Sequence, residues 1–265
     1  MEILLISIIS LAALGLLSGL LLGYASQKFA VILDPKVEQI AKALPGVNCG
    51  VCGFGGCHSL AEAIVAGKAD INTCPVGGTE AAKVIAWILG VEAKITEPQV
   101  AVMACGGGKS SAQDRFDYSG IKTCQAAVLV AQGEKACLYG CLGFGDCVTA
   151  CPFGAIKLNA ENLPVIDPKK CTACGKCIKA CPRKLFELVP SRARYLVKCL
   201  SKDKGAVVRK ICKVGCIACN LCVKECNFEA ICIADNLAYI DQKKCTHCGA
   251  CIKVCPTKCI VELYA

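Results

Sequence analysis

The spacing of its cysteines constrains this chain more than any other feature. Cysteine accounts for 26 of the 265 residues, and most of these thiols lie in runs in which another cysteine follows within a few positions. Near the C-terminus the pattern C-x2-C-x2-C-x3-C occurs twice, with Cys216, Cys219, Cys222 and Cys226 in the first run and Cys245, Cys248, Cys251 and Cys255 in the second. Thiolates in such runs are ligands of iron-sulfur clusters. We therefore expect the chain to fold around clusters of this kind.

The double run has the spacing of bacterial two-cluster ferredoxins. In those proteins the first three cysteines of a run bind one [4Fe-4S] cluster, and the fourth binds the cluster of the other run. This crossover assigns Cys216, Cys219, Cys222 and Cys255 to one cluster, and Cys245, Cys248, Cys251 and Cys226 to the other. Structural zinc is the alternative, because C-x2-C pairs also bind zinc. Zinc sites seldom need eight thiolates in two such runs, so the pattern favours iron-sulfur clusters.

The same unit occurs upstream, so the chain contains a fused repeat. The sequence of residues 151–189 is similar to that of residues 226–263 at almost every position. Each segment predicts two short strands that are followed by a cysteine run. By the crossover rule, the upstream copy would bind one cluster through Cys137, Cys141, Cys147 and Cys181, and another through Cys171, Cys174, Cys177 and Cys151. The first run of this copy departs from the standard spacing, because five residues separate Cys141 from Cys147.

A fifth cluster site is expected nearer the N-terminus. Its candidate ligands are Cys49, Cys52, Cys57 and Cys74. Glycines flank these thiols in the segment NCGVCGFGGCHS, so the backbone can approach a cluster and donate N–H groups to its sulfurs. Structural zinc, or a glycine-rich turn without a ligand, is the alternative.

Six cysteines lie outside these five sets. Four of them flank the upstream ferredoxin copy and are candidates for a sixth [4Fe-4S] site: Cys105, Cys124, Cys199 and Cys212. The alternative is that these four are buried free thiols. Cys232 and Cys259 occupy apolar strand positions and are interpreted as packing residues. Iron counting distinguishes the alternatives, because five clusters hold about 20 irons per chain and six hold about 24.

An uncharged apolar run at the N-terminus predicts a membrane anchor. Residues Ile3 to Gly23 would form a helix about 30 Å long, which is enough to cross a bilayer. A cleaved signal peptide is the alternative, but the run has no basic start and no clear cleavage site before Lys28. Positive charge lies only on its C-terminal side, at Lys28 and Lys36. We therefore expect a single-pass protein of the cell inner membrane with its globular part in the cytoplasm, where thiols stay reduced.

Helix and strand patterns together predict an α+β chain. Helices are expected near residues 34–44, 59–66 and 80–89, and short strands in both ferredoxin copies, with a linker at 93–98. The predicted domains are a transmembrane anchor at 1–27, a helical 4Fe-4S domain at 28–92, a connecting segment at 93–134, a first ferredoxin-like module at 135–190, a basic connector at 191–211 and a second ferredoxin-like module at 212–265.

The formal charge of +9 does not indicate a nucleic-acid partner. Each oxidised [4Fe-4S] core carries about +2 and its four thiolates about −4, so five sites would bring the total to about −1. The basic residues at 169–184 and 192–213 are either a docking surface for an acidic soluble ferredoxin or a solvated face. The sequence contains no P-loop, dinucleotide fingerprint or Ser-His-Asp set, so we expect no catalytic residues and transfer of single electrons.

These features resemble those of a known family. The anchor, the pattern C-G-x-C-G-x-x-G-C from Cys49 to Cys57 followed by Cys74 and Pro75, and the final double run are similar to the B subunit of the Rnf complex. The resemblance covers nearly the whole chain, and its most specific part is LPGVNCGVCGFGGCHSLAEAI. The upstream ferredoxin copy is similar to the extended form of this protein in anaerobes.

The resemblance implies a membrane-bound ferredoxin:NAD+ oxidoreductase that moves sodium ions or protons. This chain would accept electrons from reduced ferredoxin and pass them to other membrane and peripheral subunits, without an active site of its own. The alternative is a membrane-anchored polyferredoxin that supplies a different reductase or a redox regulator without ion coupling.

Overall fold

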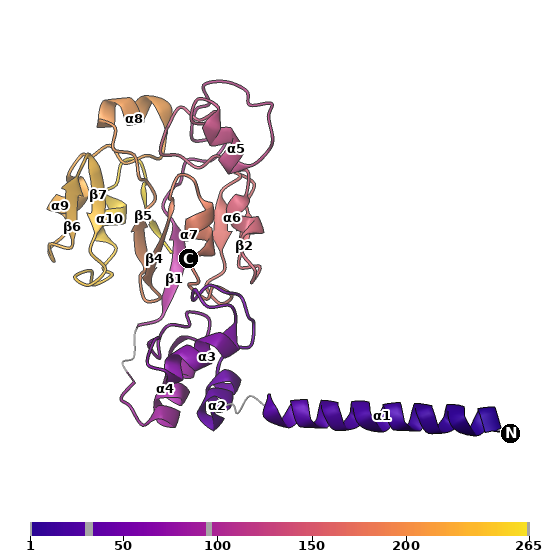
Figure 1. Ribbon diagram of the computed structural model, residues 1–265. Helices are drawn as coiled ribbons and strands as arrows, with labels where there is room; N and C mark the ends of the chain where they lie inside the picture. The colour runs from indigo at the N-terminus through magenta and orange to yellow at the C-terminus, as the bar shows by residue number, and fades with distance from the viewer. Residues whose placement is uncertain (1, 30–33, 94–96, 264–265) are drawn as a thin grey trace.

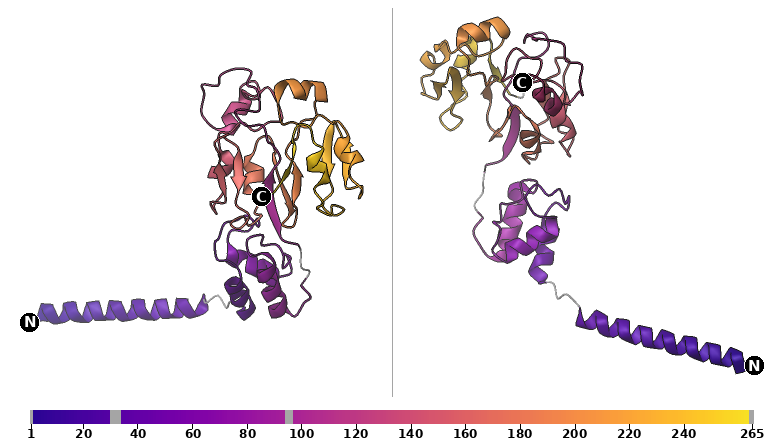
Figure 2. Two further views of the ribbon diagram at one scale, coloured as in Figure 1. Left: turned by 180° about the vertical axis from the view of Figure 1, so that it is seen from behind. Right: turned by 45° about the horizontal axis from the view of Figure 1, so that its top comes forward.

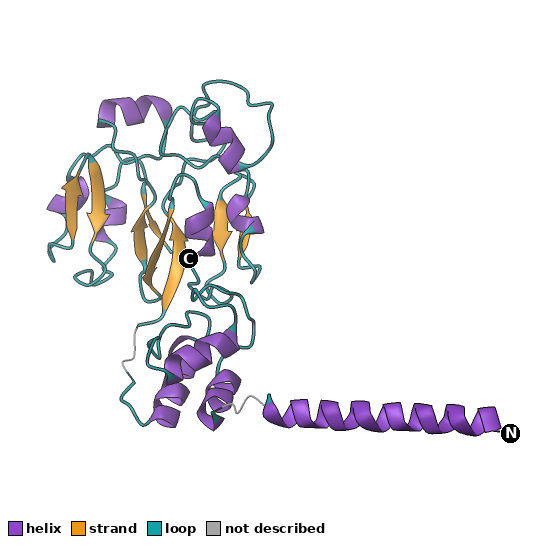
Figure 3. Cartoon of the chain, viewed as in Figure 1, coloured by secondary structure: helices purple, strands orange, loops and turns teal. Residues whose placement is uncertain are grey.

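Helices and short strands both occur along the chain, which confirms the predicted α+β class (Figure 3). The computed structural model describes residues 2–29, 34–93 and 97–263. Its helices are α1 (Glu2–Lys28), α2 (Pro35–Ala43), α3 (Cys57–Val65), α4 (Gly78–Leu89), α5 (Cys124–Leu129), α6 (Asp146–Thr149), α7 (Lys176–Ala180), α8 (Gly205–Ile211), α9 (Leu221–Lys224) and α10 (Ala250–Lys253). Its strands are β1 (Gln99–Met103), β2 (Ile156–Leu158), β3 (Pro164–Ile166), β4 (Phe186–Pro190), β5 (Tyr195–Val197), β6 (Ile231–Ala234), β7 (Leu237–Ile240) and β8 (Ile260–Glu262).

The N-terminal helix α1 extends away from the other elements in each view (Figures 1 and 2). Its stretch Leu5–Lys28 has a mean hydropathy of 2.5, and none of it is buried against the rest of the chain. A helix of this length and composition can cross a bilayer. The predicted span, Ile3 to Gly23, lies inside it.

Three helices form a small domain after the N-terminal helix α1 (Figure 1). α2 begins where Asp34 Oδ1 accepts a hydrogen bond of 2.9 Å from the backbone N–H two residues later. α3 begins at Cys57 rather than near residue 59, so a candidate ligand lies in its first turn. α4 ends at Leu89, and Gly90 directly after it has a φ of 70°, a conformation that glycine adopts without strain. The domain core contains Ile40, Leu60 and Ile85.

The first ferredoxin-like module contains two antiparallel strand pairs and two short helices. β2 and β3 form a hairpin in which Ile156 lies opposite Ile166. β4 pairs with β1, with Met103 opposite Phe186. α6 and α7 contact each other beside these strands, and the buried Cys147 and Cys177 project from them into the core.

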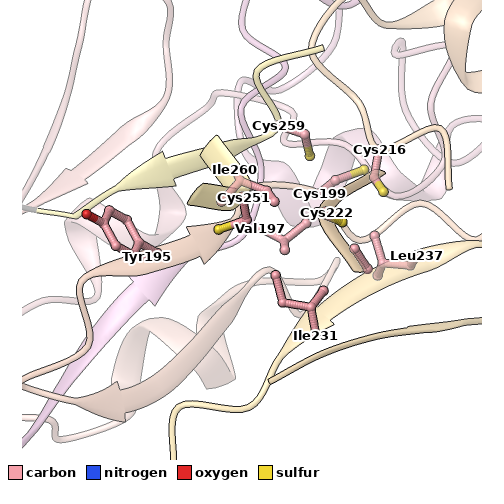
Figure 4. Close-up of a cluster of buried hydrophobic side chains, with 11 residues drawn as sticks. Tyr195, Val197, Cys199, Cys216, Cys222, Ile231, Leu237, Cys251, Cys259 and Ile260 are labelled. Atoms are coloured by element: carbon pink, nitrogen blue, oxygen red, sulfur yellow. The ribbon is translucent and has the colours of Figure 1, made fainter. Parts of the chain in front are cut away.

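The second module repeats this plan. β6 and β7 form the hairpin, β5 pairs with β8, and α9 contacts α10. Figure 4 shows its core, in which cysteine side chains lie among apolar side chains: Tyr195, Val197, Cys199, Cys216, Cys222, Ile231, Leu237, Cys251, Cys259 and Ile260. The structure therefore preserves the sequence repeat as two similar modules.

The two segments that the sequence marks as connectors contribute strands to the modules. β1 belongs to the segment 93–134 and β5 to the segment 191–211, and each pairs with the last strand of a ferredoxin copy. The side chains of Val100, Val102, Val189 and Leu196 pack together, so β1, β4 and β5 share a core. The two modules are therefore packed side by side (Figure 2). Residues 94–96 of the expected linker lie outside the described residues.

Candidate metal centres

Four cysteines near α3 line one cavity in the helical domain. They are Cys49, Cys52, Cys57 and Cys74, the complete set expected from the sequence. Asn48 has a φ of 50°, and its Oδ1 accepts a hydrogen bond of 2.8 Å from the backbone N–H of Cys57. The backbone N–H of Gly77 donates to Cys74 Sγ at 3.3 Å. Burial nevertheless raises the pKa of the Cys74 thiol. The loop and helix thus direct four thiols into a common space.

The second ferredoxin module brings together both cysteine sets expected from the crossover rule. One cavity is lined by Cys226, Cys245, Cys248 and Cys251. The second set is centred on Cys222, whose pKa is raised to about 11 by burial and by the nearby thiolates of Cys216, Cys219 and Cys255. The backbone N–H of Cys259 donates to Cys255 Sγ at 3.3 Å.

In the first module, three expected ligands gather around the start of α7. Burial raises the pKa of Cys177 to about 11, and the neighbouring thiolates of Cys171 and Cys174 act in the same direction. Cys151 packs against the same core. The backbone N–H of Ala101, in β1, donates to Cys171 Sγ at 3.4 Å. The connecting segment therefore supplies an N–H donor to this set of thiols.

The remaining set of the first module differs from the expectation. One cavity beside α6 is lined by the expected Cys141, Cys147 and Cys181, and the fourth cysteine that lines it is Cys124. Cys124 also interacts electrostatically with Cys141 and Cys147. Cys137, which the sequence places in this set, does not line the cavity.

Asp146 explains the position of Cys124. Its Oδ1 accepts a hydrogen bond of 2.9 Å from the backbone N–H of Cys124, and its Oδ2 accepts one of 3.1 Å from that of Gln125. These bonds hold the first turn of α5 beside α6, because a carboxylate satisfies N–H groups that the helix leaves unpaired. The irregular spacing before Cys147 is the sign in the sequence that this run departs from the standard pattern.

Cys137 lies instead with three cysteines of the candidate sixth set. Its thiol interacts electrostatically with those of Cys105, Cys199 and Cys212. Arg183 holds this segment in place, because its Nη1 donates to the carbonyl oxygen of Cys137 at 3.0 Å. The expected grouping of Cys124 with Cys105, Cys199 and Cys212 is therefore replaced by one that contains Cys137.

The two cysteines interpreted as packing residues differ from each other. Cys232 is exposed, because alternation along β6 turns its side chain outward, so that interpretation was wrong. Cys259 is only 2 % exposed. Its side chain packs in one cluster with those of Cys199 and Cys216, and its interaction with Cys216 lowers the pKa of Cys216 to about 6 (Figure 4). Cys259 therefore lies between two sets of thiols.

The donor sets fit [4Fe-4S] clusters. Within the described residues, no group of three or more His, Cys, Asp or Glu side chains has the arrangement that holds a single metal ion. The thiols instead gather in fours, and several of them accept backbone N–H groups. Four thiolates with N–H donors to sulfur are the usual environment of a cluster, which supplies one-electron chemistry when bound. Burial raises the pKa of several of these thiols, so they are neutral at pH 7 until iron binds.

The fold and these thiol sets define an iron-sulfur electron-transfer protein. Three segments match known families: residues 44–76 match the family described as "Putative Fe-S cluster", residues 136–185 the "4Fe-4S dicluster domain" and residues 238–261 the "4Fe-4S binding domain". These matches support several iron-sulfur clusters in one chain.

Similarity over nearly the whole length identifies the family. The chain is 44% identical to the B subunit of the Na(+)-translocating ferredoxin:NAD(+) oxidoreductase complex of Acetobacterium woodii, over 94% of this chain and 75% of the relative. It is also 44% identical to the B subunit of the ion-translocating oxidoreductase complex of Methanosarcina acetivorans, over 98% of both chains. The B subunit of the proton-translocating ferredoxin:NAD(+) oxidoreductase complex of Clostridium ljungdahlii is 42% identical over 96% of this chain and 90% of the relative. The chain belongs to this family, the B subunits of the Rnf complex, which confirms the predicted resemblance.

Proposed function

We propose that this protein accepts electrons from reduced ferredoxin and passes them through its clusters to the membrane part of an ion-translocating ferredoxin:NAD+ oxidoreductase complex. The relatives from Acetobacterium woodii and Clostridium ljungdahlii are named for ferredoxin and NAD(+) as the reaction partners. One is named for sodium ions and the other for protons. The chain itself would carry electrons and would not perform catalysis.

Five clusters form the basis of this proposal. Four of them would bind the sets expected from the spacing of the cysteines: Cys49, Cys52, Cys57 and Cys74 at site 1; Cys151, Cys171, Cys174 and Cys177 at site 3; Cys216, Cys219, Cys222 and Cys255 at site 4; Cys226, Cys245, Cys248 and Cys251 at site 5. Site 2 would bind Cys141, Cys147 and Cys181, with Cys124 as the fourth ligand. The cavity shared by these last four thiols supports that choice.

A cavity between the helical domain and the first ferredoxin module supports the order of transfer. Cys74 of site 1 and Cys171 of site 3 both line it. Within the first module, Cys147 of site 2 interacts electrostatically with Cys177 of site 3. Electrons that enter through a ferredoxin module would thus reach site 1 through site 3. The helical domain follows the membrane anchor directly in the chain, so site 1 would be the exit toward the membrane.

The anchor helix supports attachment to the inner membrane. Its length and composition suit a single crossing. Lys28 ends the helix and Lys36 follows it, so the positive-inside tendency places the globular part on the cytoplasmic side. A thiol-reactive reagent that cannot cross membranes tests this side, because the exposed Cys232 should react only in inverted vesicles.

Replacement of Cys52 by alanine tests the order of transfer. In the assembled complex, Cys52→Ala should stop electron transfer to NAD+ while reduced ferredoxin still reduces the ferredoxin modules, measured by low-temperature EPR. Cys232→Ala is the matched control, because this exposed cysteine lies outside the proposed thiol sets. If Cys52→Ala also abolished reduction of the ferredoxin modules, the proposed order would be wrong.

Co-purification tests the assignment to a coupled complex. The full chain, isolated from membranes without denaturation, should bring several polytopic membrane subunits and a flavin-containing partner with it. Isolation with a soluble reductase or regulator alone would favour the uncoupled polyferredoxin instead.

A further inference from the structure

Four buried or half-buried thiols lie between the two ferredoxin modules, outside the five sites described above. We propose that Cys105, Cys137, Cys199 and Cys212 bind a sixth [4Fe-4S] cluster at this interface, and that this cluster transfers electrons between the two modules. The proposal extends the proposed function but depends on it only for the direction of electron flow.

Proximity among the four thiols is the first observation. The thiol of Cys137 interacts electrostatically with the thiols of the other three cysteines. The thiol of Cys105 interacts with those of Cys199 and Cys212, and the thiol of Cys212 interacts with that of Cys199. Each of the six possible pairs of thiols therefore interacts. Three of the residues, Cys105, Cys137 and Cys199, are at most 9 % exposed. Cys124, the alternative fourth member, is held by Asp146 beside another cavity.

Backbone N–H groups surround the thiols as they do at cluster sites. The N–H of Cys141 donates to Cys105 Sγ at 3.4 Å, and that of Ser201 donates to Cys199 Sγ at 3.4 Å. The backbone N–H of Tyr139 lowers the pKa of the Cys137 thiol, and those of Val214 and Gly215 lower the pKa of the Cys212 thiol. Two of the four thiols therefore accept a backbone N–H, and the other two have backbone N–H groups nearby, as at sites where such groups stabilise cluster sulfurs and tune their potential.

Gly107 shows how closely the backbone approaches these thiols. A Cβ at this position would lie 3.3 Å from Cys212 Sγ and 3.8 Å from Cys105 Sγ. It would also lie 3.2 Å from the side chain of Ala112, which is tighter than ordinary contact. Because Gly107 has no side chain, the space beside these two sulfur atoms stays open. A larger side chain would fill that space.

The two modules contribute to this site in the same way. Cys105 lies two residues after β1, and Cys199 lies two residues after β5, the corresponding strand of the second module. Cys137 precedes Cys141 by four positions, and Cys212 precedes Cys216 by four positions. Each module thus provides two thiols, and neither provides four. The complete site exists only where the modules pack together.

Two basic side chains are placed to offset the negative charge of a cluster. Lys135 is 5 % exposed, forms a 2.8 Å ion pair with Asp114 and interacts favourably with the thiolate of Cys212. The guanidinium of Arg183 interacts with the thiolates of Cys137 and Cys181. A cluster with four thiolates carries about −2, so a buried and a half-buried cation here would stabilise it.

The position of this site completes a continuous series of clusters. On one side, the N–H of Cys141, a ligand of site 2, donates to Cys105 Sγ. On the other side, the thiol of Cys259 contacts both Cys199 and Cys216, a ligand of site 4 (Figure 4). The resulting order is site 5, site 4, site 6, site 2, site 3 and site 1. Each transfer oxidises one site and reduces its neighbour by one electron, and no proton or bond change is required.

Iron content of alanine variants tests both the existence and the membership of the site. The full chain should contain about 24 irons, and Cys105→Ala, Cys137→Ala and Cys124→Ala should each lose about four. The double variant Cys105→Ala/Cys137→Ala should lose about four, because both residues bind one cluster. Cys124→Ala/Cys137→Ala should lose about eight, because these residues bind different clusters. Cys232→Ala is the control and should retain all of the iron.

Several outcomes would overturn the proposal. About 20 irons in the unaltered chain, or unchanged iron in Cys105→Ala and Cys137→Ala, would show that no sixth cluster forms. A loss of about four irons in Cys105→Ala/Cys124→Ala, with about eight in Cys105→Ala/Cys137→Ala, would show that the set contains Cys124 instead of Cys137.

Serine variants provide a second measurement if an alanine variant fails to fold. Serine can retain a cluster while altering its spectrum, so Cys105→Ser and Cys137→Ser should change the same EPR signal, and Cys124→Ser should change a different one. A shared signal for Cys124→Ser and Cys137→Ser would contradict the proposal. Iron content and EPR of the isolated chain do not depend on ferredoxin, so a failure here is distinguishable from a failure of the proposed function.

Discussion

Removal of the Asp146 carboxylate should loosen the cluster of site 2 without changing any of its ligands. This carboxylate accepts hydrogen bonds from the backbone N–H groups of Cys124 and Gln125, at 2.9 and 3.1 Å. Both donors belong to the first turn of α5, which carries the proposed fourth ligand. In Asp146→Ala these N–H groups lose their acceptor, so Cys124 should leave the cavity more easily.

The expected magnitude follows from the surroundings of the two bonds. The bond to Cys124 is partly buried, and the bond to Gln125 is exposed, so water can replace the second more easily than the first. Hydrogen bonds to charged groups contribute about 1.5–3 kcal/mol when buried and less when exposed, which gives about 2 kcal/mol for Asp146→Ala. A barrier lowered by about 2 kcal/mol accelerates cluster loss about 30-fold. Asp146→Asn keeps one carbonyl oxygen as an acceptor and should accelerate loss only about fivefold.

The assay is the rate of iron release from the full chain to a chelator at pH 7. About four irons should leave faster in Asp146→Ala, and the remaining iron should leave at the unaltered rate. Asp117→Ala is the control, since Asp117 is an exposed aspartate of the same segment. Equal release rates in the unaltered chain and in Asp146→Ala would refute the reasoning, and so would acceleration spread over all of the iron.

Three further predictions concern stability, potential and pH. Ile85→Ala removes a side chain that is fully buried in the helical domain and should lower the free energy of unfolding by about 2–5 kcal/mol, whereas Trp87→Ala, at a residue that is 84 % exposed, should change it little in the same denaturation experiment. Lys135→Met removes a buried positive charge beside the proposed sixth cluster and should lower its reduction potential in an EPR-monitored titration; an unchanged potential would place that cluster elsewhere. Burial raises the pKa of Cys222 and Cys251 to about 11 in the absence of iron, so both thiols must lose protons to bind it. Cluster binding should therefore strengthen as pH rises from 6 to 9 and weaken as it falls, and pH-independent iron retention in chelator competition would contradict this.

Local spacing alone predicted most of the cysteine grouping. Within a run such as Cys245, Cys248 and Cys251, short chain segments keep the thiols close together. The spacing of two-cluster ferredoxins then assigns these three cysteines to one site. The internal repeat then allowed Cys226 to be added as the fourth ligand, and the structure places it in the same cavity. The apolar run at the N-terminus and the helices of the first domain were predictable for the same reason, because their signals are local in sequence.

The grouping of Cys124 and Cys137 depends on tertiary contacts. Cys137 and Cys141 are near neighbours in sequence, yet their thiols point into different sets, because Asp146 binds the first turn of α5 and Arg183 binds the carbonyl group of Cys137. Neither contact has a signature in the sequence, since each joins residues that are far apart in the chain.

The same distinction applies to the segments between the modules. The sequence by itself determined the number of cysteine runs, the repeat, the apolar N-terminal helix and the α+β class, because each depends on composition or on spacing over a few residues. Only the tertiary structure decided that β1 and β5 complete the modules and bring Cys105 and Cys199 together. These strands pair with partners from the other end of each module, and such long-range pairing is selected by packing of the whole fold rather than by local sequence.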